Sequence, residues 1–383
     1  MGVLLLLVGY FLGLHFFDSG EGGLVIALAI WAVMNLVAYF QGDNILLALS
    51  RAKRIGPDDH RRLYNVVEEM KIASGLDKMP DIYIVDDPGL NAFATGRNPD
   101  RAAIAITSGL LQKLSRDELQ GVIGHELAHI KNRDVLLMAM CSILLGSIVI
   151  LAWYASRFML FGAMGGSRRS SSSGGGQAQV IIFIVAIVLM ILAPILAQLI
   201  YFAISRKREY LADSSSALYT RYPEGLASAL EKLAASTSQL RTANKATAPM
   251  YIINPFRKKR MAASDLTSTH PPISERVRIL RSMAGASFVD YDRAYHEVHR
   301  AKKGVIPVSA VATAGVVSLR AAVPKAREEE PDEAHRTRET SDLMWRLSNY
   351  STITCDCGTK LRVPPKFKRS EIKCPHCGRT NPI

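Results

Sequence analysis

Cysteine is scarce in this 383-residue chain, and four of its five cysteines lie close together near the C-terminus. Secreted domains that depend on disulfides spread many cysteines along a short chain. The distribution therefore argues against a disulfide framework and favours a metal site in a reducing compartment. The fifth cysteine, Cys141, lies in an apolar run and is expected to be a small buried side chain.

Acidic residues are also in short supply, with 34 Asp and Glu against 47 Lys and Arg, which gives a net charge of +13. An excess of basic residues is typical of the cytoplasmic loops of membrane proteins, and we prefer that interpretation to nucleic-acid binding. The expected partner is thus a lipid bilayer and not a nucleic acid. A hydrophobic content of 49% with 21% charged residues predicts membrane spans combined with polar domains.

The first apolar stretch, residues 3–17, lacks the features of a cleavable signal peptide. It has no basic segment before it and no small-x-small cleavage site after it. Together with the apolar stretch 24–40 it predicts a hairpin of two short transmembrane helices over residues 1–40, joined by an acidic turn. The segment that follows is basic, which puts residues 41–134 in the cytoplasm.

A second transmembrane hairpin is predicted over residues 135–204. Two apolar runs, 135–164 and 178–204, are each long enough to cross a bilayer. The Gly- and Ser-rich stretch between them, residues 165–176, is expected to be an exposed loop. Within residues 41–134, a helix with one apolar face is predicted at 58–74 and short strands at 81–86, 91–96 and 102–107, which together predict a small α/β unit.

A helical segment in that unit contains two histidines four residues apart, His125 and His129. Ser115 and Glu118 form a capping box that predicts where this helix begins. Residues four apart share one helix face, so both imidazoles can bind one zinc ion, and Glu126 between them can reach a water at that ion. The alternative is a pair of surface histidines on an amphipathic helix.

The transmembrane hairpin predicted at residues 135–204 returns the chain to the side of the membrane from which it left. His129 lies six residues before the hairpin and Glu209 five residues after it, so both lie at a similar depth on neighbouring helices. Glu209 is therefore the candidate third zinc ligand, within a second cytoplasmic segment at residues 205–285 that completes the unit begun at 41–134. Asp213, one helical turn further on, is expected to accept the second N–H of a ligand histidine. The alternative for Glu209 is an ordinary charge beside two arginines.

The C-terminal part is predicted to contain a linker and a small metal module. Residues 286–350 include a charged, proline-bearing run and are expected to be a partly disordered linker. Residues 351–383 resemble a zinc ribbon with a closed, structural zinc site, and disulfides or an unstructured tail are the alternatives. The proposed ligands are two cysteine pairs, each followed by glycine: Cys355, Cys357, Cys374 and Cys377.

Several of these motifs, in this order, resemble the HtpX-type membrane zinc metallopeptidases, relatives of the CAAX prenyl-protein endopeptidases. The resemblance covers roughly residues 1–285, and the C-terminal cysteine module departs from it. It is carried by Asn91-Ala92-Phe93-Ala94, by His125 to Asp134, by Glu209 with Asp213, and by Thr269-His270-Pro271.

The resemblance implies a multi-pass endopeptidase of a prokaryotic cytoplasmic (inner) membrane, with its active site facing the cytoplasm. It implies a role in protein quality control, with misfolded or damaged membrane proteins and unfolded polypeptides as substrates. Asn91, Ala92 and Phe93 would bind the substrate backbone as an added strand. His270 would lie near the reacting centre and support the oxyanion.

The predicted fold is thus an α+β membrane protein. It has four transmembrane helices, a cytoplasmic zincin-like metallopeptidase domain and a small C-terminal zinc ribbon. Glu126 would be the general base, and zinc held by His125, His129 and Glu209 would activate water. Three alternatives remain: a prenyl-protein processing protease, a non-proteolytic membrane scaffold that recruits partners through the ribbon, and a membrane-tethered nucleic-acid-binding ribbon. The sequence leaves the oligomeric state open.

Overall fold

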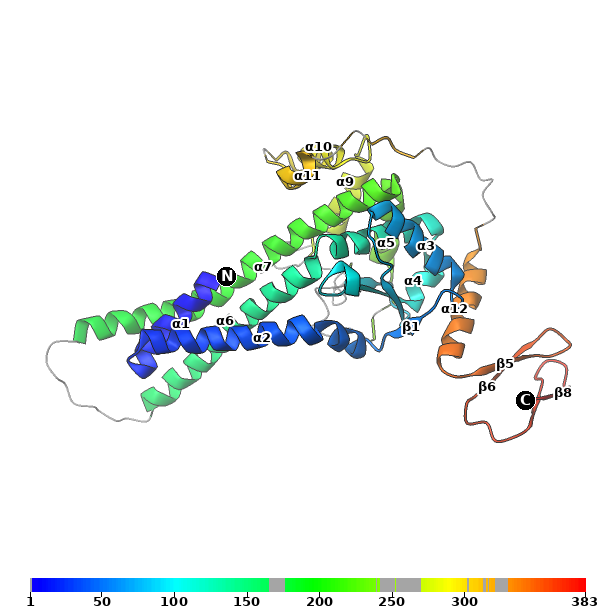
Figure 1. Ribbon diagram of the computed structural model, residues 1–383, viewed down its shortest axis with the longest axis horizontal. Helices are drawn as coiled ribbons and strands as arrows, with labels where there is room; N and C mark the ends of the chain where they lie inside the picture. The colour runs from blue at the N-terminus through cyan, green and yellow to red at the C-terminus, as the bar shows by residue number, and fades with distance from the viewer. Residues whose placement is uncertain are drawn as a thin grey trace.

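Apolar helices pack into an elongated bundle at one end of the molecule (Figure 1). The computed structural model describes residues 2–164, 176–238, 240–241, 252, 270–301, 303–312, 315, 317–320 and 330–383. The residues predicted as a Gly- and Ser-rich loop lie outside this set, apart from Gly176. The bundle consists of α1 (Gly2–Phe17), α2 (Gly20–Leu49), α6 (Asp134–Met164) and α7 (Gly176–Thr220).

Three helical stretches among the described residues are long and apolar enough to cross a membrane: Gly20–Val37, Asp134–Trp153 and Phe183–Thr220. Helix α1 was predicted as a fourth span; it is apolar but has 16 residues, which is fewer than the roughly 20 that a bilayer requires. It lies close against α2, because a Cβ atom on Gly13 would be 2.6 Å from the Cα of Gly23. Small residues of this kind permit close helix packing in membranes.

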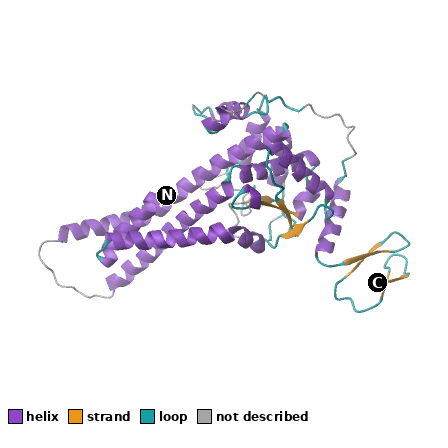
Figure 2. Ribbon diagram, in the orientation of Figure 1, coloured by secondary structure: helices purple, strands orange, loops and turns teal. Residues whose placement is uncertain are grey.

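A four-stranded sheet lies beside the end of the bundle, in the strand order β1-β2-β4-β3 (Figure 2). Strands β2 and β4 are parallel, and the two outer pairings are antiparallel. The strands predicted at residues 81–86, 91–96 and 102–107 are confirmed as β2, β3 and β4 with small shifts of their ends, whereas β1 was not predicted. The bounds are β1 (Lys53–Ile55), β2 (Asp81–Val85), β3 (Ala92–Thr95) and β4 (Ala103–Thr107), with a short 3-10 helix at Pro99–Arg101 before β4.

Helices cover one face of this sheet and form the main core with it. The amphipathic helix α3 (Arg61–Ser74) buries the predicted apolar face, and α5 (Arg116–Lys131) packs against α3. On the other face, Phe93 and Ala105 lie in a smaller cluster with Leu47 at the end of α2. The sheet is thus held between the helices of the main core and the bundle. Helix α8 (Pro223–Ala235) packs against α5, α9 (Ile273–Arg281) packs against α8, and α4 (Ser108–Lys113) contacts β4.

The predicted linker at residues 286–350 is wrong in at least two stretches, where the structure has packed helices. Helix α10 (Phe288–His299) begins with a capping box at Ser287 and buries Tyr291 in the main core. Helix α12 (Glu333–Leu347) is capped by Asp332 and buries Leu343 in the same core. The polar composition hid these helices, because each presents only a narrow apolar stripe. Helix α11 (Val308–Ala312) is a single short turn between them.

The C-terminal residues form two small antiparallel hairpins. Strands β5 (Ser351–Thr354) and β6 (Lys360–Val363) make one, and β7 (Glu371–Lys373) and β8 (Thr380–Pro382) make the other. Arg362 on β6 bonds Asp342 of α12 at 2.9 Å, and its guanidinium lies 5.0 Å from the centre of the Trp345 ring. The first hairpin therefore rests on α12, which joins it to the main core (Figure 1).

Helix α12 gives a direct test of the corrected C-terminal fold. Leu343→Ala should lower the free energy of unfolding by about 2–5 kcal/mol, because it leaves a cavity in the main core. Val308→Ala, at a position that is 83% exposed, should change it by less than about 0.5 kcal/mol. Denaturant unfolding of the detergent-purified chain measures both. Equal effects of the two substitutions would contradict the packing of α12.

Candidate metal centre

The metal-binding motif lies on α5, at the middle of the core. The helix begins as the sequence predicted: the Ser115 hydroxyl accepts from the Glu118 backbone at 3.3 Å, and the Glu118 carboxylate accepts from the Ser115 backbone at 2.8 Å. Gly121 allows α8 to approach, because a Cβ atom there would be 2.6 Å from the Leu226 nitrogen. The motif is therefore held on a helix that is packed on several sides.

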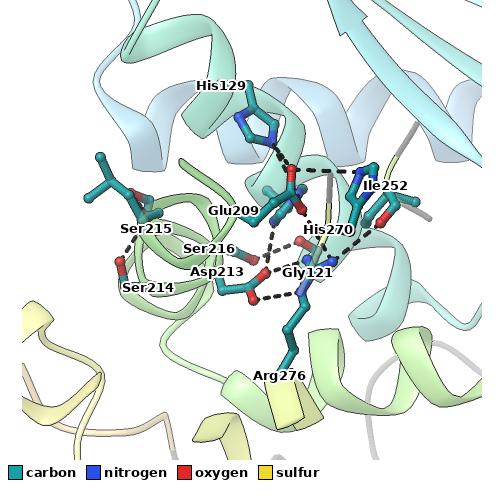
Figure 3. Close-up of polar contacts among 12 residues, drawn as sticks. Gly121, His129, Glu209, Asp213, Ser214, Ser215, Ser216, Ile252, His270 and Arg276 are labelled. Atoms are coloured by element: carbon teal, nitrogen blue, oxygen red, sulfur yellow. Dashed lines mark hydrogen bonds and ion pairs between the residues drawn. The ribbon is translucent and has the colours of Figure 1, made fainter. Parts of the chain in front are cut away.

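Three predicted ligands converge at one point in the structure. The Nε2 atoms of His125 and His129 are 3.2 Å apart. The Glu209 carboxylate, which comes from α7, lies 3.6 Å from His125 Nε2 and 3.5 Å from His129 Nε2. Figure 3 shows the Glu209 carboxylate between His129 and His270. Helix α7 thus brings Glu209 back to the motif, as the hairpin predicted at residues 135–204 required.

The spacing of these atoms fits a zinc ion. Ligand atoms about 2.0–2.1 Å from zinc in a tetrahedron are about 3.3 Å from one another. The three separations in the structure, 3.2, 3.5 and 3.6 Å, agree with that value. Two imidazoles and one carboxylate are also the donor set of catalytic zinc sites, which leaves a fourth position for water or substrate.

Burial sets the acid–base properties of the motif. Glu126 is 1% exposed, and its burial raises the pKa of the carboxyl to about 7. A general base works best when its pKa lies near the working pH. Burial lowers the pKa of His125. Burial acts in the same direction on His129, but its hydrogen bonds to Asp134 and Glu209 outweigh it and hold the His129 pKa well above its usual value.

Each ligand histidine is oriented by a carboxylate behind it. Asp213 was predicted as such a partner, and its Oδ1 lies 3.0 Å from His125 Nδ1. The second partner is Asp134, whose role was not predicted; its Oδ2 lies 2.9 Å from His129 Nδ1. Arg133 has a positive φ of 55°, which ends α5 and turns the chain so that Asp134 faces back toward the motif. The sequence signal that could have revealed this contact is a carboxylate five residues after the second histidine.

Arg276 is the other residue whose importance the sequence did not reveal. It projects from α9, is 0% exposed and makes two hydrogen bonds to Asp213, of 2.6 and 2.8 Å (Figure 3). Its Nη1 atom also lies 3.2 Å from Glu209. One arginine therefore contacts both a ligand and the partner of a ligand. Its spacing from Asp213 along the chain gave no signal of this contact.

The remaining predicted site residues lie around the centre. His270, just before α9, has its Nε2 3.9 Å from Glu209 Oε1. Asn91 and Ala92 lead into β3, an outer strand of the sheet, where Ile252 donates a backbone hydrogen bond of 3.2 Å to Ala92. The Phe93 side chain is buried in the small cluster near α2, so any contact of this residue with substrate would use its backbone. The roles of these residues in catalysis remain predictions.

The four C-terminal cysteines come together at a second point. The Sγ atoms of Cys355 and Cys377 are 3.6 Å apart, and those of Cys357 and Cys374 are 3.7 Å apart. Zinc–sulfur bonds of about 2.3 Å in a tetrahedron place the sulfurs about 3.8 Å apart. All four thiols are free. The cluster thus fits a metal site better than the disulfide alternative.

Similarity to known proteins agrees with this geometry. Residues 57–284 match peptidase family M48, a family of zinc-dependent metallopeptidases. A protease HtpX homolog of Dictyoglomus turgidum is 45% identical over 268 residues, which make up 70% of this chain and 84% of that protein. Another from Streptococcus uberis is 40% identical over 280 residues, or 73% of this chain and 93% of that protein.

Among solved structures, the crystal structure of S. mikatae Ste24p has a TM-score of 0.44 and 20% identity, and the match covers 73% of this chain and 63% of that one. The resemblance inferred from the sequence motifs is confirmed by the family match and by the HtpX relatives. The C-terminal cysteine cluster lies beyond the matched residues. The chain belongs to peptidase family M48.

Proposed function

We propose that the protein is an integral-membrane zinc endopeptidase that cleaves misfolded or damaged membrane proteins at the cytoplasmic face of a prokaryotic inner membrane. The observation that carries the proposal is the convergence of His125, His129 and Glu209 beside the buried Glu126. The HtpX proteases among its relatives support the assignment to proteolysis.

The chemistry follows from the arrangement of these side chains. His125, His129 and Glu209 would hold the zinc ion. When bound, zinc supplies a Lewis acid that polarises the scissile carbonyl and makes water a nucleophile near neutral pH. Glu126 accepts the proton of the attacking water and then passes it to the leaving amine. His270, beside Glu209, would donate a hydrogen bond to the developing oxyanion.

Arg276 and the two backing carboxylates keep the ligands in place. Asp213 fixes the orientation of His125 and Asp134 that of His129, so that each Nε2 atom is directed to the metal position. Arg276 balances the charge of the fully buried Asp213 and also contacts Glu209. Preorganisation of this kind lets the site bind metal without rearrangement.

Charge and hydropathy support the membrane arrangement. We propose four spans, formed by α1, α2, α6 and α7, although α1 must tilt little or thin the bilayer locally. Asp18 lies in the turn between the first two helices and Glu21 in the first turn of α2, whereas the segment after α2 carries several basic residues. The positive-inside rule then places the sheet and the metal centre in the cytoplasm.

We propose that the C-terminal hairpins are a zinc ribbon with a closed, structural site. Sulfur separations of 3.6 and 3.7 Å support this. Gly358 and Gly378 each follow the second cysteine of a pair and have positive φ values of 84° and 75°, which close the two turns around the metal position. Four thiolates would leave no open coordination position on the metal, so the ribbon would have no catalytic role. It would instead serve to grip substrates or bind a partner.

The first test separates zinc binding from catalysis. Glu126→Gln should retain zinc but lose hydrolysis of an unfolded protein by about 10²–10⁴-fold, because it removes only the general base. Glu209→Ala should lower the affinity for zinc itself. Zinc content and cleavage rate are measured on the same preparations. Turnover by Glu126→Gln at the wild-type rate would contradict the mechanism.

The second test concerns Arg276. Arg276→Met should lower the free energy of unfolding by about 3–5 kcal/mol, because it leaves buried carboxylates unpaired. It should also weaken zinc binding by about 10–100-fold. Arg281→Met, on the same helix, removes two exposed ion pairs, with Glu224 and Glu231, and should cost about 1 kcal/mol or less. Unchanged zinc affinity in Arg276→Met would show that the arginine does not support the site.

The third test counts metal ions. The wild-type chain should bind about two zinc ions, one in each cluster. Cys374→Ser should bind about one and keep the ion held by His125, His129 and Glu209, because the ribbon lies apart from that centre. Cys141→Ser is the matched control, since Cys141 lies in the apolar bundle and should leave the count at two. Two zinc ions bound by Cys374→Ser would rule out the ribbon site.

A further inference from the structure

A cavity of about 260 Å³ lies beside the metal ligands, where the bundle meets the peptidase core. Glu126, His129 and Glu209 form one part of its lining. The rest comes mainly from the ends of α2, α6 and α7 that are nearest to the core, which lie side by side in Figure 1. The cavity is thus continuous with the place where a peptide bond would be cleaved.

Apolar side chains form the wall opposite the ligands. Helix α6 contributes Met138, Ala139 and Ile143, and α2 contributes Leu46. Tyr201 of α7 also lines the cavity, and its hydroxyl bonds Ser142 at 3.2 Å, so this polar group is already satisfied. The wall therefore offers apolar contact to whatever enters.

The charged residues of the lining, apart from the ligands and Glu126, stand in pairs of opposite sign. Arg208 bonds Asp134, which in turn holds His129. Asp43 faces Arg97 across the gap between α2 and the end of β3. A charged side chain that entered the cavity would lose its hydration. The lining residues would offer it no unpaired group of opposite charge in return.

We infer that this cavity receives one bulky apolar side chain of the substrate, next to the bond that is cleaved. The inference rests on the proposed peptidase function and names the substrate preference of the same site. The volume is below the roughly 300–1,000 Å³ typical of sites for drug-sized ligands, which suits a single side chain better than a lipid chain. Residues such as Leu, Phe and Met, which abound in membrane proteins, meet this requirement.

Because the apolar wall of the cavity belongs to helices of the bundle, these helices determine the preference for bulky apolar side chains. Ala139 and Ile143 lie within the apolar stretch Asp134–Trp153 of α6, four residues apart and hence on one helix face. The helix that anchors the protein therefore also selects the residue to be cleaved. A larger side chain at Ala139 should fill the cavity, and a smaller one at Ile143 should enlarge it.

The experiment maps the bonds cleaved in casein, an unfolded protein, by the zinc-loaded enzyme in detergent. Mass spectrometry gives the residues on each side of every cleaved bond. Wild-type enzyme should favour bulky apolar residues over Ala and Gly on one side by about ten-fold or more in kcat/KM, the range that differences of a few methylene groups produce.

Two variants and one control test the assignment to the cavity. Ala139→Phe should abolish the preference for bulky residues while cleavage next to Ala continues, and Ile143→Ala should shift the preference toward Trp. Leu137→Phe is the matched control, since Leu137 lies on the same helix, is 38% exposed and is not among the lining residues. Each preparation is checked for zinc content and for its thermal unfolding, so that misfolded variants are recognised.

Failure of the inference and failure of the proposed function give different results. Wild-type cleavage without any side-chain preference, or an unchanged preference in both cavity variants, would overturn the inference and leave the peptidase intact. If the enzyme cleaved a prenylated peptide and showed no side-chain preference in casein, the occupant of the cavity would be a lipid. This result would also overturn the inference. A zinc-loaded wild type that cleaves nothing would overturn the proposed function itself.

Discussion

The Arg276 guanidinium is completely buried between two carboxylates, Asp213 and Glu209. Without it, a ligand and the partner of a ligand would both carry charge in a site closed to solvent, at a cost of several kcal/mol. The arginine comes from α9, the carboxylates from α7 and the histidines from α5. This single ion-pair network therefore holds together three helices that are distant in sequence, and the metal centre depends on their alignment.

The same helices connect the metal centre to the membrane. Helix α7 is continuous from its apolar part to Glu209 and Asp213, and α6 begins at Asp134, which bonds His129. The site can therefore lie only a few turns from the apolar bundle, and the cavity beside it is walled by the bundle itself. Under the proposed function, proximity of this kind would favour substrates that emerge from a bilayer over freely diffusing proteins.

Local patterns were sufficient to predict much of this arrangement. The Ser115 capping box, the spacing of His125 and His129, and the return of a hairpin to the same side led to the three converging ligands. Arg276 could not be predicted in this way, because a contact between Asp213 and α9 depends on tertiary packing. Asp134 was hidden for a different reason: it faces the motif only because Arg133 adopts a left-handed conformation. The helices α10 and α12 were missed because polar composition masks a narrow apolar stripe.

The most direct test of the account is a zinc titration of the metal-free enzyme, purified in detergent, with casein hydrolysis followed at each step. The account predicts that hydrolysis is absent without zinc and rises in proportion to the occupancy of the site formed by His125, His129 and Glu209. It reaches its maximum when about two ions are bound in total, one of them in the cysteine cluster. Full hydrolysis by enzyme that has been shown to contain no zinc would contradict it.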